Sequence, residues 1–338
     1  MASEDGHDAH LWKAAVELGI AGLLVDAEYG GIGAGPIEIE IVMEEAGAAL
    51  MPAPLLSSAV MATELVADSR DDAAKARLLP GFLSGATIAT VAITGEKGLW
   101  TPEDVSVAAT AHGGIWRVSG IASYVLWAGI ANVLLVVARS GAGLRVYEVD
   151  PKAQGVPIEP LKSWDRTLRL SRISFDAALA TRIAGTDETT IARMLDVARV
   201  ALAGEQAGAA RKMFDMTVEY LKTRIQFGRP IGGFQALKHM AADLLLEVES
   251  ATSAARQAAR ALAEGSPDKN VLVSLAAFAC ADAFAQVAAT AIQMHGGIAF
   301  TWEHPAHLYL RRARADAQLL GASARYREDY VSALEKAS

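Results

Sequence analysis

Residues 224–235 read RIQFGRPIGGFQ, and the organisation of the second half of the chain follows from this stretch. Helical patterns lie on both sides of it. Gly228 and Pro230 break the first helix, because glycine is too flexible for a helix interior and proline lacks the backbone N–H that a helix needs. Phe234 begins the next apolar repeat. The stretch is therefore expected to connect two long helices.

Three polar residues of this stretch, Arg224, Gln226 and Gln235, go beyond what a connection requires. An arginine at a helix end, beside free backbone donors, can hold a diphosphate because its guanidinium is always charged and multidentate. A second stretch, QMHGG at residues 293–297, follows another long helical pattern. Its two glycines would let a flat or phosphorylated ligand approach the backbone closely.

The chain around these stretches is strongly helical from residue 187 to the end. Apolar residues recur with helical spacing along one stripe, namely Leu237, Met240, Ala241, Leu244, Leu245 and Val248. Residues 268–294 form another long, alanine-rich pattern. Long helices joined by short loops predict an antiparallel bundle.

The first half of the chain changes texture near residue 88. Before that point, short helices are expected at residues 10–18, at residues 37–50 and in a segment that ends near Leu83. After it come short segments rich in Val, Ile and Thr, which predict a small antiparallel barrel or sandwich. These expected strands are residues 88–93, 106–109, 115–118, 133–138 and 145–149. The predicted fold is α+β and mainly α, with domains at residues 1–87, 88–182 and 183–338.

The composition excludes several classes of protein. A chain of 338 residues with 52% hydrophobic content can bury a large core. Its net charge of −8 argues against a nucleic-acid binder, which would need a basic face. We see no run of about 18–20 apolar residues and no signal peptide, so we expect no membrane partner. The single cysteine, Cys280, is expected to be buried, and it fits a cytoplasmic location.

Other candidate sites have simpler interpretations. Residues 30–35 are rich in glycine, but no βαβ pattern surrounds them, so we expect a connection and not a nucleotide loop. Histidines cluster near residue 304, but their spacing matches no strong metal signature, and we expect no metal. Arginines near residue 312 are expected to form a solvated or salt-bridged helix face. The histidine cluster comprises His295, Glu303, His304 and His307. The arginine group comprises Arg311, Arg312 and Arg314.

The stretches at 224–235 and 293–297 closely resemble two motifs of the acyl-CoA dehydrogenase family, R-x-Q-F-G-x-P-I-x-x-F-Q and Q-x-x-G-G. The resemblance covers nearly the whole chain. Residues 15–33, AVELGIAGLLVDAEYGGIG, are similar to the family's N-terminal helical segment, with Asp26 where proline is usual. Residues 78–81 also match. The resemblance implies an N-terminal helical domain, a middle β-domain and a C-terminal four-helix bundle.

The resemblance also implies FAD as cofactor and an acyl-CoA thioester as substrate for α,β-dehydrogenation. In this family the flavin ring lies in a subunit's own pocket, while a neighbour's bundle holds the adenine and diphosphate. The neighbour-facing residues are intact here. By resemblance, the diphosphate is held by Arg224, Gln226 and Phe227 with support from Gln235, and the adenosine side by Gln293, Met294, His295, Gly296 and Gly297.

Most of the residues that would contact the chain's own flavin differ from those usual in the family. The family's T-E-P-x-x-G-S-D-like turn is here TGEKGLW at residues 94–100, in which only Thr94 is clearly kept. The family's aromatic-Ile-Ser/Thr-Asn run is YVLW at residues 124–127. Tyr124 can still stack, but Leu126 cannot donate a hydrogen bond to the ring, and an unpaired buried polar atom costs about 1–3 kcal/mol.

The catalytic base is missing from both places where the family carries it. Most members have a glutamate where this chain has Leu320, and others have it where this chain has Ala198, just before an arginine. That arginine is Arg199, which the resemblance places at the substrate. Ala322 and Ala324 stand where a cofactor-contacting Thr and Gln are usual.

Three carboxylates lie near these positions in the sequence. Glu205 is a weak candidate for the base, and we expect it to pack or to pair instead. Asp196 lies on the same predicted helix. Asp316 lies one helical turn before Leu320 and is expected to face solvent or an arginine.

Three functions remain open. The favoured one is a non-catalytic subunit of a heterotetrameric acyl-CoA dehydrogenase, because the losses fall on one side of the cofactor only. Paired short subunits of this kind resemble actinobacterial enzymes that act on bulky CoA thioesters such as steroid side chains. One alternative is a self-sufficient homo-oligomeric enzyme whose base is relocated to Glu205 or Asp316. The other is a flavin-free structural member of the fold.

Overall fold

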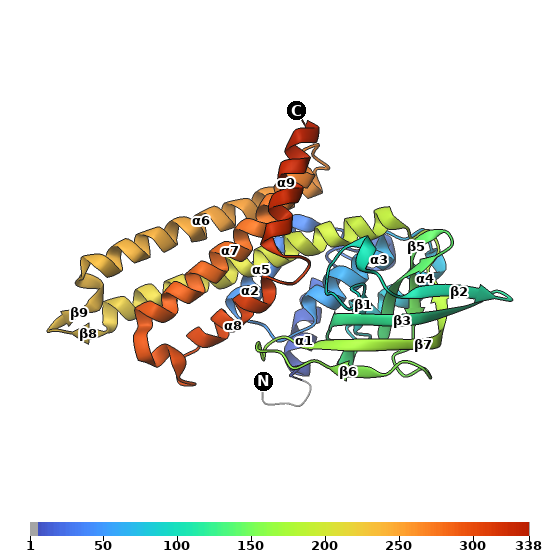
Figure 1. The fold of residues 1–338 in the computed structure, drawn as a ribbon, viewed down its shortest axis with the longest axis horizontal. Helices are drawn as coiled ribbons and strands as arrows, with labels where there is room; N and C mark the ends of the chain where they lie inside the picture. The colour runs from blue at the N-terminus through green and yellow to red at the C-terminus, as the bar shows by residue number, and fades with distance from the viewer. Residues whose placement is uncertain (1–5, 338) are drawn as a thin grey trace. The chain divides into compact units, whose positions relative to one another are not determined.

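The computed structural model describes residues 6–337, which fold into two compact units (Figure 1). The barrel unit comprises the described part of Met1–Gly35 together with Pro52–Ala198. The bundle unit comprises Pro36–Met51 together with the described part of Arg199–Ser338. The predicted boundaries at 87/88 and 182/183 stay predictions, but β1 begins at Ala89 and β7 ends at Arg182.

Two helices of the barrel unit, α1 and α4, begin at capped positions. Asp8 accepts hydrogen bonds from the first backbone N–H groups of α1, and Asp71 does the same for α4. The helices predicted at residues 10–18 and before Leu83 are confirmed. The helical segments of this unit are α1 (Ala9–Glu17), η1 (Ile20–Gly22), η2 (Ala27–Tyr29), η3 (Leu55–Ala62), α3 (Thr63–Ala67), α4 (Asp72–Leu83), η4 (Pro102–Asp104) and η5 (Ala128–Ile130).

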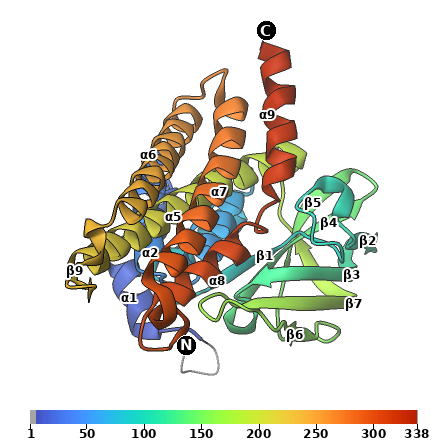
Figure 2. The same ribbon diagram turned by 60° about the vertical axis from the view of Figure 1, so that its left-hand side comes forward.

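Within the described residues, the middle of the chain forms a seven-stranded sheet. Its strands are β1 (Ala89–Ala92), β2 (Ala108–His112), β3 (Ile115–Leu126), β4 (Val133–Ser140), β5 (Gly143–Val149), β6 (Ile158–Pro160) and β7 (Leu170–Arg182). β5 pairs with both β4 and β7, so β4, β2, β3, β7 and β5 form a closed ring around an apolar core (Figure 2). The predicted barrel is confirmed.

The expectation of a purely antiparallel sheet is wrong. Both β1 and β2 pair with β4 in parallel. A parallel pair needs a long connection, and here β2 and β3 lie in the connection between β1 and β4. The sequence prediction also missed β6 and β7. Alternating burial along the first half of β7 is the period-2 signal that could have revealed it.

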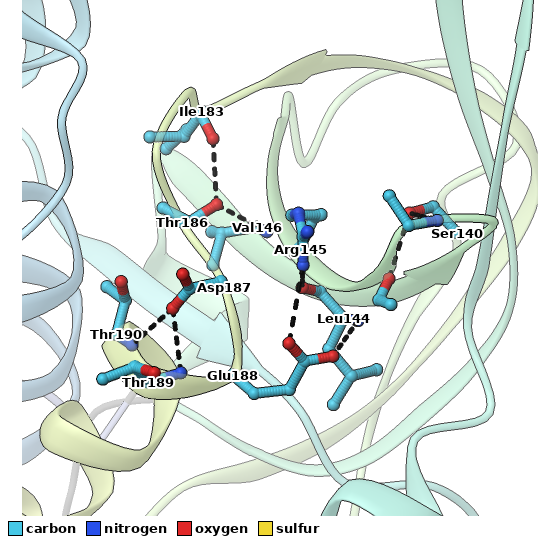
Figure 3. Close-up of polar contacts among 12 residues, drawn as sticks. Ser140, Leu144, Arg145, Val146, Ile183, Thr186, Asp187, Glu188, Thr189 and Thr190 are labelled. Carbon is cyan, nitrogen blue, oxygen red and sulfur yellow. Dashed lines mark hydrogen bonds and ion pairs between the residues drawn. The ribbon is translucent and has the colours of Figure 1, made fainter.

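The long helix α5 (Glu188–Thr223) starts against the barrel (Figure 3). Asp187 caps it by accepting hydrogen bonds of 2.9 and 3.1 Å from two backbone N–H groups of the first turn. The carboxylate of Glu188 accepts a 2.7 Å hydrogen bond from the Leu144 N–H and lies 3.6 Å from the Arg145 guanidinium. These contacts attach the beginning of α5 to β5.

The bundle unit contains the later part of α5 and long helices beside it (Figures 1 and 2). Its elements are α2 (Pro36–Ala48), β8 (Ile225–Gln226), β9 (Arg229–Pro230), η6 (Ile231–Gly233), α6 (Gln235–Ala263), α7 (Lys269–His295), η7 (Gly296–Phe300), α8 (Ala306–Asp316) and α9 (Ser323–Ala337). Apolar side chains from α5 to α8 share one core that includes Met213, Leu244, Val248, Phe284 and Tyr309. The predicted stripe on α6 lies against this core except for Leu245, which is 40% exposed.

Helix α2 packs into the bundle unit although it is distant in sequence. Glycines permit this close approach. A Cβ on Gly47 would lie 1.9 Å from the Glu205 carbonyl oxygen, and one on Gly208 would lie 1.8 Å from that of Glu44. Larger residues at these positions would push α2 and α5 apart.

The expectation that no segment is long and apolar enough to cross a membrane is wrong for α7. The segment Lys269–Phe300 contains an 18-residue window with a mean hydropathy of 1.8, of which 56% is buried inside the fold. The physical reason is its alanine content, which raises hydropathy and also lets the helix pack closely in a bundle core. Such a core helix is weak grounds for a membrane span.

Candidate cofactor and active site

The motif at residues 224–235 forms a short exposed hairpin at the end of α5. Ile225 pairs with Pro230, and Gln226 pairs with Arg229. Phe227, at the tip, adopts a φ of +53° and is 89% exposed. Positive φ is unfavourable for a bulky residue and is typical of functional sites that the surrounding structure supports.

The polar side chains of both motif segments face solvent. Arg224 and Gln226 on the hairpin, Gln235 at the start of α6 and Gln293 near the end of α7 are all exposed. A guanidinium and three amides supply donors and acceptors for phosphate, ribose and base groups.

Two glycines leave open space at the end of α7. Gly296, with a φ of +69°, ends α7, and a Cβ on Gly296 or Gly297 would meet no neighbouring atom within 4 Å. A ligand can therefore reach the backbone at this point. Met294, by contrast, is buried in the bundle core and is not open to a ligand.

His295 lies inside a stack of rings that sequence reasoning did not anticipate. Its ring lies 4.6 Å from that of Tyr220 and 4.5 Å from that of His304. Its Nδ1 is 2.8 Å from the Ala291 carbonyl oxygen, and burial lowers its pKa. The available sequence signal is the pair of histidines, His295 and His304, nine positions apart. Among the described residues no group of three or more His, Cys, Asp or Glu side chains could hold a metal ion.

In the barrel unit, the turn that follows β1 bonds to its own chain. The buried Thr94 hydroxyl donates to the Ser123 carbonyl oxygen. One carboxylate oxygen of Asp104 accepts from the Gly95 N–H at 3.0 Å and from the Leu99 N–H at 2.9 Å. Three donors of this turn, the Thr94 hydroxyl and the Gly95 and Leu99 N–H groups, are therefore used inside the fold.

At the end of β3, Tyr124 is 41% exposed, whereas the residues after it are buried. Tyr124 has a φ of +56°, and a Cβ on Gly98 would lie 2.6 Å from its ring, so the ring covers that glycine. Leu126 is buried, and its carbonyl oxygen accepts a 2.5 Å hydrogen bond from the Thr90 hydroxyl. Trp127 is buried as well. Leu126 therefore offers no side-chain donor at the position where the resemblance implies a flavin-facing hydroxyl.

The two positions of the missing base are occupied by buried apolar side chains. Ala198 is 0% and Leu320 1% exposed. In the bundle unit, Arg199 and Leu320 line one cavity of about 10 Å³ together with Asp316 and Tyr326. Asp316 is only 1% exposed, so it does not face solvent, and the alternative expectation, that it faces an arginine, stays a prediction. It lies at the end of α8, and its side chain points into the unit.

Glu205 pairs with an arginine, as predicted. Its carboxylate accepts a hydrogen bond from the Arg312 guanidinium, and the two side chains are 10% and 3% exposed. A carboxylate held in this way is poorly placed to remove a proton. Arg312 thus belongs to the salt-bridged part of the helix face predicted for α8, while Arg314 is exposed.

Comparison with known proteins adds two matching family models. The model of the acyl-CoA dehydrogenase N-terminal domain matches residues 1–86, and that of the C-terminal domain matches residues 188–334. Acyl-CoA dehydrogenase IpdE2 of Mycolicibacterium smegmatis is 34% identical over 322 residues, covering 95% of this chain and 86% of that protein. Acyl-CoA dehydrogenase FadE34 of Mycobacterium tuberculosis is 38% identical over 310 residues, covering 91% of this chain and 40% of that protein.

Solved structures of the same fold include two whose descriptions name two components. The ChsE4-ChsE5 complex from Mycobacterium tuberculosis matches with a TM-score of 0.91 and 28% identity, covering 99% of this chain and 90% of that chain. A variant of the Tcur3481-Tcur3483 steroid ACAD matches with a TM-score of 0.89 and 28% identity, covering 99% and 91%.

Proposed function

Because this chain belongs to the acyl-CoA dehydrogenase family, whose members are oxidoreductases acting on CH–CH groups, we propose that it is the non-catalytic subunit of a heteromeric, FAD-dependent enzyme. Its bundle unit holds the adenine and diphosphate end of an FAD whose flavin ring lies in a homologous partner subunit. The substrate is an acyl-CoA thioester with a bulky or steroid side chain.

The observation that carries this proposal is an asymmetry between the two sets of cofactor residues. In the bundle unit, Arg224 and the glutamines are exposed, and Gly297 has open space beside it. In the barrel unit, the Thr94 hydroxyl and two backbone N–H groups already bond to the chain itself. The first set fits a dinucleotide end, and the second does not fit a flavin ring. Random loss of function would not sort the residues in this way.

The absence of a base supports the same assignment. A bound flavin accepts a hydride from the β-carbon, but a carboxylate must remove the α-proton, and general-base catalysis contributes about 10²–10⁴-fold. Leu320 and Ala198 cannot take a proton, and Glu205 is held by Arg312. Asp316 lines a cavity of about 10 Å³, which has no room for an acyl group. The base is therefore assigned to the partner subunit.

The solved relatives favour a two-component assembly. One is described as a ChsE4-ChsE5 complex and the other as a Tcur3481-Tcur3483 steroid ACAD. Both cover nearly the whole of this chain. They support a heterotetramer and a steroid-type thioester as the starting hypotheses for this protein.

The test is to purify the chain alone and together with a homologous subunit encoded by a neighbouring gene. Flavin absorbance per subunit and acceptor reduction with acyl-CoA thioesters are then measured for both preparations. We expect no turnover from the chain alone, and one flavin for each pair of subunits in the active complex. A full flavin per chain with turnover in the absence of a partner would overturn the proposal.

Substitution of Arg224 tests the assigned cofactor site within the same complex. Arg224→Ala should weaken flavin retention by roughly ten- to a hundredfold, because a hydrogen bond to a charged group is worth about 1.5–3 kcal/mol. Lys222→Ala is the matched control, since Lys222 is also exposed near the end of α5 but pairs with Glu219. Equal flavin retention in the two variants would discredit the site.

A further inference from the structure

The turn at residues 317–322, between α8 and α9, has an unusual backbone. Leu320, at the position of the missing base, has a φ of +60°, and Gly321 has a φ of +135°. Leucine rarely adopts the left-handed region, and such a conformation persists only where the surrounding structure holds it. Contacts around Leu320 must therefore fix this turn.

Tyr326, on the first turns of α9, supplies those contacts. Its hydroxyl donates a hydrogen bond to the Leu320 carbonyl oxygen, and it accepts one of 3.3 Å from Arg199 Nε. The Arg199 guanidinium also lies 5.5 Å from the centre of the Tyr326 ring. Burial raises the pKa of Tyr326, which keeps the hydroxyl protonated and able to donate.

The tyrosine also fits against the backbone of the turn. A Cβ on Gly321 would lie 2.8 Å from the Tyr326 hydroxyl oxygen and 2.9 Å from the ring carbon that carries it. Only glycine permits this approach. The hydroxyl, the glycine and the left-handed leucine therefore form one interlocked arrangement.

The space that remains beside this arrangement is small. The cavity has a volume of about 10 Å³ and is lined by Arg199, Leu202, Gln206, Ala277, Ala281, Asp316, Leu319, Leu320, Gly321 and Tyr326. That is room for about one water molecule. No part of an acyl chain enters it. The base position of this chain is thus filled by its own side chains.

We propose that Tyr326 is a positioning residue whose hydroxyl locks the turn at residues 317–322 in a closed conformation at the position of the missing base. The function of this lock rests on the proposed non-catalytic role. A subunit that binds no acyl group does not need this turn to open. The lock itself is a property of the chain alone, so it can be tested without flavin, substrate or partner.

The test measures how often the turn opens. Leu320→Cys introduces a thiol at the base position, and the native Cys280 is buried, so the rate of labelling by a thiol reagent reports on residue 320. The labelling rate is compared with and without Tyr326→Phe, which removes the hydroxyl and keeps the ring. Tyr330→Phe is the matched control, since Tyr330 lies one turn further along α9 with its ring 5.9 Å from that of Phe278.

We expect Tyr326→Phe to accelerate labelling at residue 320 at least tenfold, and Tyr330→Phe to leave it unchanged. Amide hydrogen exchange of the single variants, with Leu320 intact, should show the same increase confined to residues 319–322. Equal rates in the two variants would overturn the proposal. So would faster exchange throughout α9, because that would indicate general destabilisation and not a local lock. Neither result bears on flavin stoichiometry, so the failure of this inference and of the proposed function are distinguishable.

Discussion

Glu40 is a buried carboxylate that the proposed function does not use. It lies on α2, is 1% exposed, and its Oε1 has no hydrogen-bond partner within the described part of the chain. Burial, together with the nearby Glu44 carboxylate, raises its pKa from 4.5 to about 7, while the Arg256 guanidinium acts in the opposite direction. The folded state therefore favours the protonated form of Glu40.

The sign of the resulting pH dependence follows from that shift. The contribution of Glu40 to stability is fully present below its unfolded pKa of 4.5 and is lost as the pH rises through about 7. Above that pH, the protein folds only with Glu40 ionised and buried or with Glu40 protonated, and both lower the free energy of unfolding. A pKa difference of this size corresponds to roughly 3 kcal/mol.

We predict that Glu40→Gln stabilises the protein at alkaline pH. The free energy of unfolding at pH 8.5, measured by urea denaturation, should rise by roughly 2–3 kcal/mol, with little change at pH 4.5. Glu45→Gln is the control, because Glu45 is exposed on the same helix. If the Glu40→Gln and wild-type curves coincide at both pH values, this account of Glu40 is wrong.

At the scale of elements, the end of α7 combines a helix stop with an open surface. Gly296 ends the helix with a positive φ, and Gly297 follows it without neighbours in the space where a side chain would lie. A side chain at residue 297 would therefore clash with no neighbouring atom of the fold, and the backbone there is accessible to a ligand. A substitution at Gly297 can therefore test ligand binding without disturbing the fold.

Gly297→Leu should consequently leave the fold intact and block the cofactor. We expect a melting temperature within about 2 °C of the wild type, because surface substitutions away from special features change stability by less than about 0.5 kcal/mol. Flavin retention by the assembled complex should fall by roughly tenfold or more, because the new side chain fills the ligand's approach.

The matched control for this experiment is Gly141→Leu. Gly141 lies in the hairpin between β4 and β5, and a Cβ there also meets nothing within 4 Å. Flavin content after gel filtration measures the difference. A Gly297→Leu complex that keeps its flavin as well as the control would remove α7 from the cofactor site.

For the whole molecule, the main organising feature is that α2 belongs to the bundle unit. Its backbone contacts α5 through Gly47, Gly204 and Gly208, where a Cβ on each would lie within 2.5 Å of a carbonyl oxygen of the other helix. Tyr309 on α8 also donates a 2.6 Å hydrogen bond to the Ala48 carbonyl oxygen. A bundle without α2 would expose these surfaces to water.

We predict that a fragment of residues 188–338 unfolds with poor cooperativity. The same fragment with residues 36–51 joined to it through a flexible Gly/Ser linker should unfold cooperatively, with a midpoint at least about 5 °C higher, because it regains the buried contacts of α2. Thermal circular dichroism is the measurement. A linked segment with a scrambled sequence is the control, and equal behaviour of the two linked fragments would contradict the prediction.

Much of this arrangement could be predicted from local patterns. The apolar stripe along α6 predicted a helix, and the glycine and proline of residues 224–235 predicted a connection. The change of period near residue 88 predicted the start of the barrel. These signals are local, because the apolar periodicity of a helix or a strand can be recognised within a short stretch of sequence. The predicted pairing of Glu205 was right as well, because a charged residue in an apolar helix needs a partner.

Other features had no local signal. Asp316, expected to face solvent or an arginine, is buried, and Glu40 gave no sign of its raised pKa, since burial depends on which elements pack around a residue. The parallel partners of β4 and the packing of α2 also join segments that are distant in the chain. Pattern reasoning assigns a residue to a face but does not say what covers that face.

The sequence by itself determined the family and the order of helices and strands, because each depends on residue identity and short-range spacing. The motif residues proposed for the cofactor and the proposed loss of both bases also come from the sequence. Only the tertiary structure decided that Thr94 and the turn after β1 bond inward, that Arg224 and Gly297 remain open, and that Tyr326 locks Leu320. The physical reason is that hydrogen-bond partners and free space are set by contacts between segments far apart in the chain.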